Sequence, residues 1–252
     1  MLEPAMRQGQ GDVSVALSPA PSLRPPAPVL LELFGPPGAG KSTLAATLMA
    51  RTGCRGRVQP DAAWQRLPLR AKLRLLLASA ADLGCVASAV RAALLLRLWS
   101  PESLTRLSRV VLKTARLRQT PWPAVFDQCL LQDLWSVLWA SGRFDPDPRH
   151  LAPLLRHMYR GVPVRILYLD LDPGIAARRV AARAGGHSRL DGLRESETAR
   201  RLAAAADLPR LIATAARLAG LPIIPLDATM SPEQLAEAAM ASWTKPVCER
   251  TS

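Results

Sequence analysis

The sequence has few cysteines, and they are far apart. Four are present among 252 residues, at Cys54, Cys85, Cys129 and Cys248, and no two form a C-x-x-C pair. This pattern gives neither a zinc-binding spacing nor a disulfide framework, because both need clustered or regularly spaced cysteines. It is typical of a protein kept in a reducing compartment, so we expect a cytoplasmic protein.

Long apolar runs are also lacking. The first 28 residues contain no apolar segment behind a basic start and do not predict a signal peptide. The most apolar stretch, 75–90, contains Asp82 and is bounded by Arg74 and Arg91. It is shorter than the roughly 20 apolar residues that a helix needs to span a bilayer. The sequence therefore predicts a buried helix here and no membrane span.

Positive charge is abundant but dispersed. Lysine and arginine total 33 against 20 acidic residues, which gives a formal net charge of +13. The arginines follow the whole chain without a dense basic block, and aromatic residues make up 4%. Because a nucleic-acid interface concentrates basic residues on one face or in one run, we do not expect a nucleic-acid partner. A basic surface remains compatible with a membrane surface or with phosphorylated small molecules.

The order of apolar runs predicts an α/β domain over residues 29–243, between two tails. Residues 1–28 are rich in Pro, Gly, Ser and Gln and are expected to form a disordered or extended tail, and 244–252 form a second tail. Short apolar runs predict strands at 29–34, 124–127, 164–169 and 222–226. Strands that alternate with helices indicate a parallel sheet with right-handed crossovers.

The region from 64 to 118 is leucine-rich at helical spacing. It is expected to be helical, with breaks at Gly84 and at Ser100–Pro101. Serine before proline is typical of a helix start, where the serine side chain caps and the proline occupies the first helical position. A possible short strand around Val58 precedes this region, and Asp61 just after it is a candidate contact for an acceptor hydroxyl.

One motif is written out in full. The segment after the first predicted strand matches the P-loop pattern G-x-x-x-x-G-K-[ST]. We expect it to bind a nucleoside triphosphate through Gly35, Pro36, Pro37, Gly38, Ala39, Gly40, Lys41, Ser42 and Thr43. Backbone N–H groups and the N-terminus of the helix predicted at 42–51 would hold the phosphates. Lys41 would reach the β- and γ-phosphates, and Ser42 would coordinate Mg²⁺. A chance match in a Gly-Pro turn is disfavoured, because an apolar strand precedes the motif and a helix follows it.

Asp127 ends the second long predicted strand, where α/β sheets bind their ligands. It is a candidate metal ligand, through water, and a candidate base for an attacking hydroxyl. The structural alternative is an N-cap for the next helix. Gln128 beside it is a candidate hydrogen-bonding partner of the acceptor.

A cluster of arginines follows the third long predicted strand. Arg178, Arg179 and Arg183 lie on one predicted helix, and Arg189 and Asp191 follow a Gly-Gly hinge. Arginines on a closing flap would neutralise a transferring phosphoryl group and exclude water. The alternative is a solvated basic helix.

These elements together resemble the thymidylate kinase branch of small P-loop kinases. The resemblance is carried by the P-loop, Asp127, the strand Leu167–Pro173, the arginine-rich loop and the closing strand at 223–228. It implies the P-loop NTPase three-layer sandwich, with a parallel sheet, a helical acceptor region at 64–118 and a lid at 178–192. It further implies ATP as donor, Mg²⁺ as cofactor, Lys41, Asp127, Arg183 and Arg189 as catalytic residues, and a possible homodimer.

The sequence departs from that family at one position. Thymidylate kinases carry Asp-Arg at the end of the middle strand and deoxynucleoside kinases carry Glu-Arg-Ser, whereas this chain has Asp127-Gln128. The arginine that clamps an acceptor phosphate is therefore missing.

Three classes of function follow from these observations. The first is a kinase that phosphorylates a small-molecule hydroxyl or phosphate acceptor, such as a nucleoside, a nucleotide or a sugar. The second is an ATPase or ATP-binding switch that acts on a protein partner, although the sequence lacks an Asn-Lys-x-Asp element and a Leu-Ser-Gly-Gly signature. The third is a member of the fold that binds ATP without turning it over and serves as an interaction module.

Overall fold

The computed structural model describes residues 29–53, 55–57, 68–70, 74, 77, 79, 82–119, 123–182 and 195–244. The N-terminal segment 1–28, Val58, Asp61 and the segment 183–194 lie outside the described residues. The predictions made for them, and those for residues 245–252, therefore remain predictions.

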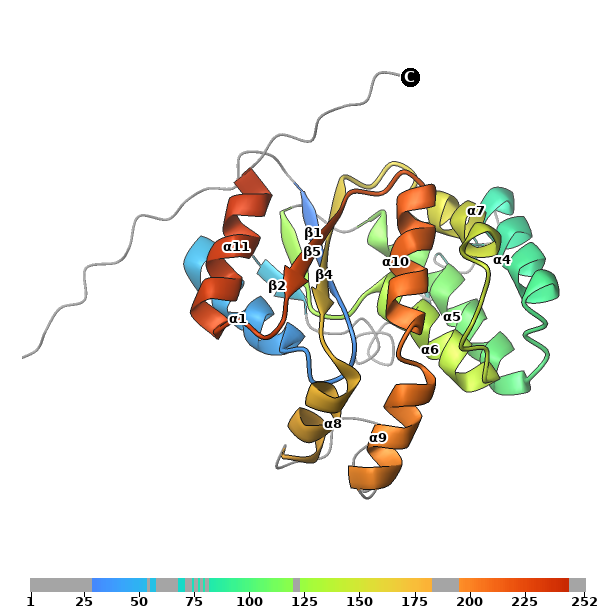
Figure 1. Ribbon diagram of the computed structural model, residues 1–252. Helices are drawn as coiled ribbons and strands as arrows, with labels where there is room; N and C mark the ends of the chain where they lie inside the picture. The colour runs from blue at the N-terminus through green and yellow to red at the C-terminus, as the bar shows by residue number, and fades with distance from the viewer. Residues whose placement is uncertain are drawn as a thin grey trace, which may run out of the picture.

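A five-stranded parallel sheet forms the centre of the molecule (Figure 1). Its strands, in chain order, are β1 Leu30–Phe34, β2 Arg55–Arg57, β3 Ala124–Phe126, β4 Val164–Asp170 and β5 Ile223–Asp227. Their order across the sheet is β2-β3-β1-β4-β5, and Leu30 of β1 pairs with Ala124 on one side and Val164 on the other. Because β1 is central, the loop that follows it emerges in the middle of the carboxyl edge, where ligands bind in sheets of this kind.

Both faces of β1 are buried, which explains its uninterrupted apolar sequence. Leu30 and Phe34 belong to one core cluster, together with residues of helices on that face. Leu31 and Leu33 point to the other face and join a second cluster. Two separate cores on the two faces of one sheet confirm the predicted three-layer architecture.

Nine helices pack around the sheet in the described part of the chain. They are α1 Lys41–Thr52, α4 Leu83–Leu95, α5 Pro101–Leu117, α6 Leu130–Ser141, α7 Pro148–Met158, α8 Pro173–Ala181, α9 Glu195–Ala204, α10 Leu208–Leu218 and α11 Pro232–Thr244. None of the helices in the described part of the chain has both the length and the apolar character needed to cross a membrane.

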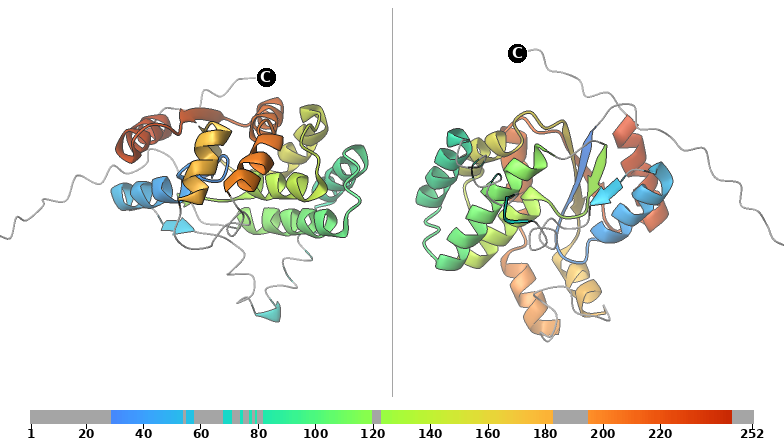
Figure 2. Two further views of the ribbon diagram at one scale, coloured as in Figure 1. Left: turned by 60° about the horizontal axis from the view of Figure 1, so that its bottom comes forward. Right: turned by 180° about the vertical axis from the view of Figure 1, so that it is seen from behind.

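The helices divide between the two faces of the sheet (Figures 1 and 2). Helices α1 and α11 cover one face, and α5, α6, α7 and α10 lie on the other side. Helix α4 packs outside them against α7 and α5. Helices α8 and α9 lie side by side beyond the carboxyl edge of the sheet. The loop after β1 and the start of α8 therefore meet at the same edge.

The helix starts in the region from 82 to 117 follow local capping. Ser100 accepts a hydrogen bond from the Ser103 N–H at 3.1 Å, so α5 begins as the Ser-Pro pair predicts. The predicted break at Gly84 is wrong by two residues. Asp82 caps α4 by accepting a hydrogen bond from the Cys85 N–H at 3.1 Å, and Gly84 lies within the first turn of the helix. The start of α4 is therefore determined by the capping side chain of Asp82 and not by Gly84.

Candidate functional site

The P-loop joins β1 to α1, and its glycines take conformations or approaches that a side chain would disturb. Gly38 and Gly40 have φ angles of +81° and +83°, which side-chain-bearing residues rarely adopt. At Gly40 a Cβ atom would meet nothing within 4 Å, so only the backbone conformation requires glycine there. At Gly38 a Cβ would also lie 2.9 Å from the carbonyl oxygen of Ala176 in α8. The loop is thus both turned and closely packed against α8.

Lys41 is the first residue of α1 and is buried. Its ammonium donates hydrogen bonds to the carbonyl oxygens of Gly35 and Pro36, both at 2.8 Å. The side chain therefore curls over the loop that precedes it, and its positive charge is held inside the ring of the P-loop backbone. No acidic residue occupies the first turn of α1. The positive end of the helix is available to an anion such as a phosphate.

Ser42 and Asp127, both predicted as metal ligands, lie in contact. The Ser42 hydroxyl donates a hydrogen bond to Asp127 Oδ2 at 3.0 Å. Asp127 immediately follows β3, which pairs with β1, so sheet order brings the two residues together across the carboxyl edge. Asp127 is 3% exposed, and its Oδ1 atom has no hydrogen-bonding partner among the described residues. A buried carboxylate oxygen without a partner is costly, and a cation would satisfy it.

The oxygens of Ser42 and Asp127 suit Mg²⁺ better than they suit a metal ion that only protein side chains coordinate. Magnesium prefers oxygen ligands and is usually bound by one or two protein groups together with phosphates and water. The described residues contain no group of three or more His, Cys, Asp or Glu side chains that could hold a metal ion. The Ser42 hydroxyl and the Asp127 carboxylate supply the one or two protein ligands that Mg²⁺ needs when phosphates and water complete its coordination.

Arg179 lies beside the P-loop. From α8, its Nη1 donates to the carbonyl oxygen of Ala228 at 2.9 Å and reaches that of Gly38 at 3.5 Å. It therefore links the P-loop to the segment after β5. Arg183, Arg189 and Asp191, the other members of the predicted lid, lie outside the described residues.

Glu32 is a buried carboxyl group that sequence reasoning missed. It is 0% exposed in the middle of β1, where its Oε1 accepts a hydrogen bond from the Leu131 N–H at 2.9 Å and its Oε2 accepts one from the Tyr159 hydroxyl at 2.5 Å. Burial raises the pKa of Glu32 to about 7, and the two hydrogen bonds oppose this rise. Helix α6 begins three residues after Asp127, so Glu32 fixes the start of the helix to which Asp127 leads.

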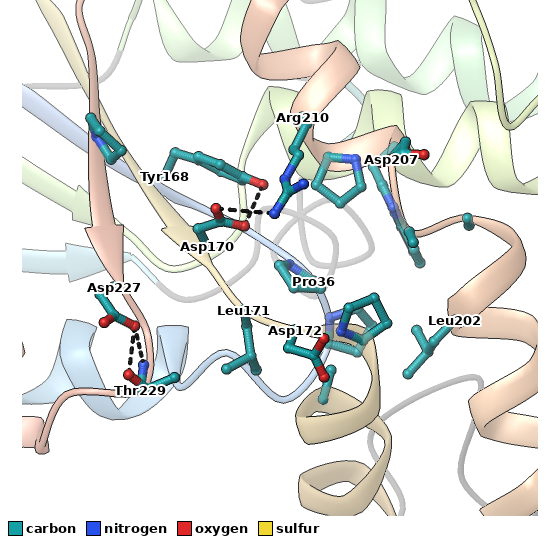
Figure 3. A pocket seen from close by; sticks show the side chains of 18 of the residues that line it. Pro36, Tyr168, Asp170, Leu171, Asp172, Leu202, Asp207, Arg210, Asp227 and Thr229 are labelled. Carbon is teal, nitrogen blue, oxygen red and sulfur yellow. Dashed lines mark hydrogen bonds and ion pairs between the residues drawn. The ribbon is translucent and has the colours of Figure 1, made fainter.

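A cavity of about 550 Å³ opens at the carboxyl ends of β4 and β5 (Figure 3). Its lining includes Pro36 and Pro37 of the P-loop and residues of α8, α9 and α10. Asp170, the last residue of β4, accepts a hydrogen bond from the Tyr168 hydroxyl at 3.2 Å. It also pairs with Arg210 of α10 at 3.5 Å. The same rule that selected Asp127, an acid at the end of a buried strand, would have selected Asp170.

Comparison with known proteins gives one family and several similar folds. Residues 30–209 match the model of a family described as an AAA domain. No curated protein matches the chain. The matched span contains the P-loop, Asp127 and most of the residues that line the cavity.

Solved structures similar to the chain include those of deoxyadenosine kinase from M. mycoides. The structure with the products dCMP and a flexible dCDP bound is 16% identical, with a TM-score of 0.47, and the match covers 85% of this chain and 97% of that chain. The structure with bound dATP is also 16% identical, with a TM-score of 0.48, and the match covers 86% of this chain and 100% of that chain.

Proposed function

The chain belongs to the AAA domain family of P-loop kinase-like proteins, and on that premise we propose that it is an ATP-dependent phosphotransferase. It moves the γ-phosphoryl group of Mg-ATP to a small-molecule acceptor, a nucleoside, a nucleotide or a sugar-like compound. The observation that carries the proposal is the contact of Ser42 with Asp127 at 3.0 Å, directly beside the P-loop lysine. Phosphoryl transfer needs phosphates, a divalent cation and positive charge to meet at one point.

Lys41 would hold the β- and γ-phosphates of the donor. Its ammonium is hydrogen-bonded to the carbonyl oxygens of Gly35 and Pro36. Phosphate oxygens in the loop would offer it stronger, charge-assisted hydrogen bonds than neutral carbonyls do. The backbone N–H groups of the loop and the N-terminus of α1 would hold the same phosphates.

Ser42 and Asp127 would hold Mg²⁺. When bound, the cation would neutralise charge that develops on the phosphates during transfer. Within the protein, Asp127 Oδ1 is the oxygen that lacks a partner among the described residues, and Oδ2 orients the Ser42 hydroxyl. A base role for Asp127 competes with this one, because an oxygen bound to a cation is a weaker proton acceptor.

The proposed reaction forms one bond and breaks one. The acceptor oxygen attacks the γ-phosphorus, and the bond from that phosphorus to the β,γ-bridging oxygen breaks, so ADP leaves with the electron pair. The acceptor hydroxyl loses its proton to Asp127 or to water. Arg183 and Arg189 are proposed to stabilise the charge on the transferring group. The protein contributes position and charge, which account for most of the catalysis of phosphoryl transfer.

The test is ADP release from Mg-ATP with and without pooled acceptors: nucleosides, nucleoside monophosphates, sugars and aminoglycosides. The Lys41→Ala variant serves as the control for contaminating enzymes. We expect ADP release that depends on an acceptor and disappears in the variant. Release at an equal rate without any acceptor would contradict the proposal and indicate an ATPase that acts on a protein partner.

A further inference from the structure

The cavity at the ends of β4 and β5 lies next to the place where a γ-phosphate would be held. Pro36 and Pro37 line it, and they are the second and third residues of the P-loop. Both precede Lys41 in the same loop. The Lys41 ammonium donates a hydrogen bond to the carbonyl oxygen of Pro36 at 2.8 Å. A ligand in the cavity would therefore contact the same loop that would hold the phosphates.

The cavity is negatively charged in a strongly basic protein. Four carboxylates, Asp170, Asp172, Asp207 and Asp227, line it, and Arg210 is the one cationic side chain among the lining residues that the structure describes. The formal charge of this described lining is therefore −3, whereas the whole chain carries +13. Such a site repels a negatively charged group such as a phosphate on a ligand. A hydroxyl or an ammonium group, by contrast, is an effective hydrogen-bonding partner for a carboxylate.

Arg210 is already committed to a partner within the cavity. Its guanidinium lies 3.5 Å from Asp170 Oδ2, and the Asp170 carboxylate raises the pKa of Arg210. Figure 3 shows the two side chains pointing toward one another from α10 and β4, with Tyr168 beside them. This pairing reduces the positive charge that the cavity can offer to a phosphate. It also fixes the Asp170 carboxylate in place.

The other carboxylates keep oxygens for a ligand. Asp172 uses Oδ1 to accept hydrogen bonds from the N–H groups at the start of α8, and Asp227 uses Oδ1 for Thr229. Asp207 precedes α10 without a side-chain hydrogen bond to that helix. It is exposed, and Figure 3 shows it close to the start of the helix that carries Arg210.

Apolar side chains form the remaining walls. Leu171, Leu202 and Pro209 are buried residues that line the cavity, and Trp135 of α6 contributes as well. A volume of about 550 Å³ lies within the range of small-molecule sites, roughly 300–1,000 Å³. Apolar walls with carboxylates at the rim suit a ring whose faces are apolar and whose edge carries hydroxyl or amino groups.

We propose that this cavity is the acceptor site, and that its ligand is a polyhydroxyl compound that is neutral or carries an amino group and bears no phosphate. The inference rests on the proposed phosphotransfer and narrows its acceptor class. Asp207 and Asp170 determine the preference of the site for a ligand without a phosphate.

The test compares matched probes that differ in one group. Glucosamine, glucose and glucose 6-phosphate share a ring, and adenosine and AMP share a nucleoside. Binding of each is measured by calorimetry in the presence of a non-hydrolysable Mg-ATP analogue, and transfer is measured as ADP release. Asp207→Asn and Asp170→Asn remove one cavity charge each. Asp145→Asn is the matched control, because Asp145 is exposed and does not line the cavity.

We expect an unphosphorylated probe to bind and its phosphorylated partner to bind at least about tenfold more weakly, a difference of roughly 1.4 kcal/mol. Asp207→Asn should raise the KM or Kd of that probe about fivefold or more and leave the KM for ATP within about twofold, as should Asp170→Asn. Asp145→Asn should change neither constant.

Three results overturn the assignment. They are a preference for the phosphorylated probe, an effect of Asp207→Asn on the KM for ATP in place of the acceptor, and the absence of binding by every unphosphorylated probe. The two proposals also fail separately. Binding that Asp207→Asn weakens, without any ADP release, would support the cavity and contradict phosphotransfer. Transfer that neither cavity variant affects would support phosphotransfer and contradict the cavity.

Discussion

The Ser42 hydroxyl donates a hydrogen bond to Asp127 Oδ2 at 3.0 Å, which joins two residues 85 positions apart in the chain. One belongs to the first turn of α1 and the other follows β3. Their contact places a buried carboxylate beside the P-loop, where a cation bound to the phosphates would need it. The proposed function depends on this pair more than on any other contact.

The role of Asp127 predicts a large effect on activity with little effect on folding. Asp127→Asn keeps an oxygen that accepts the Ser42 hydrogen bond but removes the charge. We expect turnover to fall by roughly 100-fold or more, because charge neutralisation by the cation contributes several kcal/mol. The measurement is ADP formation as a function of Mg²⁺ concentration, with the unfolding midpoint in urea measured in parallel.

The free energy of unfolding distinguishes a metal-binding role of Asp127 from a purely structural one. A carboxylate that served only to stabilise the fold would, when replaced, lower the unfolding midpoint and leave the Mg²⁺ dependence of the remaining activity unchanged. That combination would contradict the metal-site assignment.

The glycines of the P-loop predict a graded series. Gly40→Ala introduces only the strain of a positive φ, which costs about 1 kcal/mol of stability. Gly38→Ala adds a 2.9 Å approach to the carbonyl oxygen of Ala176, so it should destabilise the protein more and displace the loop from α8. Both should weaken ATP binding, measured by calorimetry.

Gly53→Ala is the control for this series. Gly53 ends α1 with a φ of +65° and open space around its Cβ position, so it carries the same kind of strain at the opposite end of the same helix. It should lower stability by about 1 kcal/mol and leave ATP affinity unchanged. Equal losses of affinity in Gly53→Ala and Gly40→Ala would show that only helix stability matters.

Arg179 predicts an effect on the donor nucleotide. Arg179→Ala removes the hydrogen bond to Ala228 and the contact with Gly38, and so detaches the P-loop from the segment after β5. We expect the KM for ATP to rise several-fold, since each charge-assisted hydrogen bond contributes about 1.5–3 kcal/mol. Arg217→Ala, an exposed arginine in the last turn of α10, should leave it unchanged. An unaltered KM in Arg179→Ala would show that the P-loop holds its conformation without this bridge.

Glu32 predicts a dependence of stability on pH. Its pKa is raised from 4.5 to about 7 in the folded protein, so between these values the folded state holds a proton that the unfolded state has released. The free energy of unfolding should therefore fall as pH rises from about 4.5 to about 7, by about 3 kcal/mol in total, and this contribution should be constant above that.

Two variants test the origin of this slope by urea unfolding between pH 4.5 and 8. Glu32→Gln cannot titrate and should lose the slope. Tyr159→Phe removes a hydrogen bond that lowers the pKa of Glu32, so its slope should extend to higher pH. A slope that is the same in Glu32→Gln and in the unaltered protein would assign it to other groups.

The sequence predicted those parts of the site whose position follows from the topology of a parallel sheet. Asp127 could be selected because the carboxyl ends of parallel strands share one edge, and the P-loop lies at that edge. Neither step required knowledge of side-chain conformations. The contact with Ser42 then followed from the pairing of β1 with β3.

Glu32 and Arg179 could not be predicted in the same way. Glu32 stands in an apolar strand, and its partners Leu131 and Tyr159 lie 99 and 127 residues away. Leu131 belongs to α6 and Tyr159 caps the end of α7, and the sequence does not specify how these helices pack. Arg179 was recognised as part of a basic cluster, but its contact with the P-loop depends on how closely α8 approaches Gly38. Long-range packing determined both roles.

The central claim is tested most directly by following the γ-phosphorus itself. ATP labelled at the γ-phosphate is incubated with Mg²⁺, the protein and an acceptor identified by the ADP assay, and the products are separated. The account predicts label on the organic acceptor in a one-to-one ratio with ADP, and none with Lys41→Ala. Label recovered only as inorganic phosphate, with no phosphorylated acceptor, would contradict it.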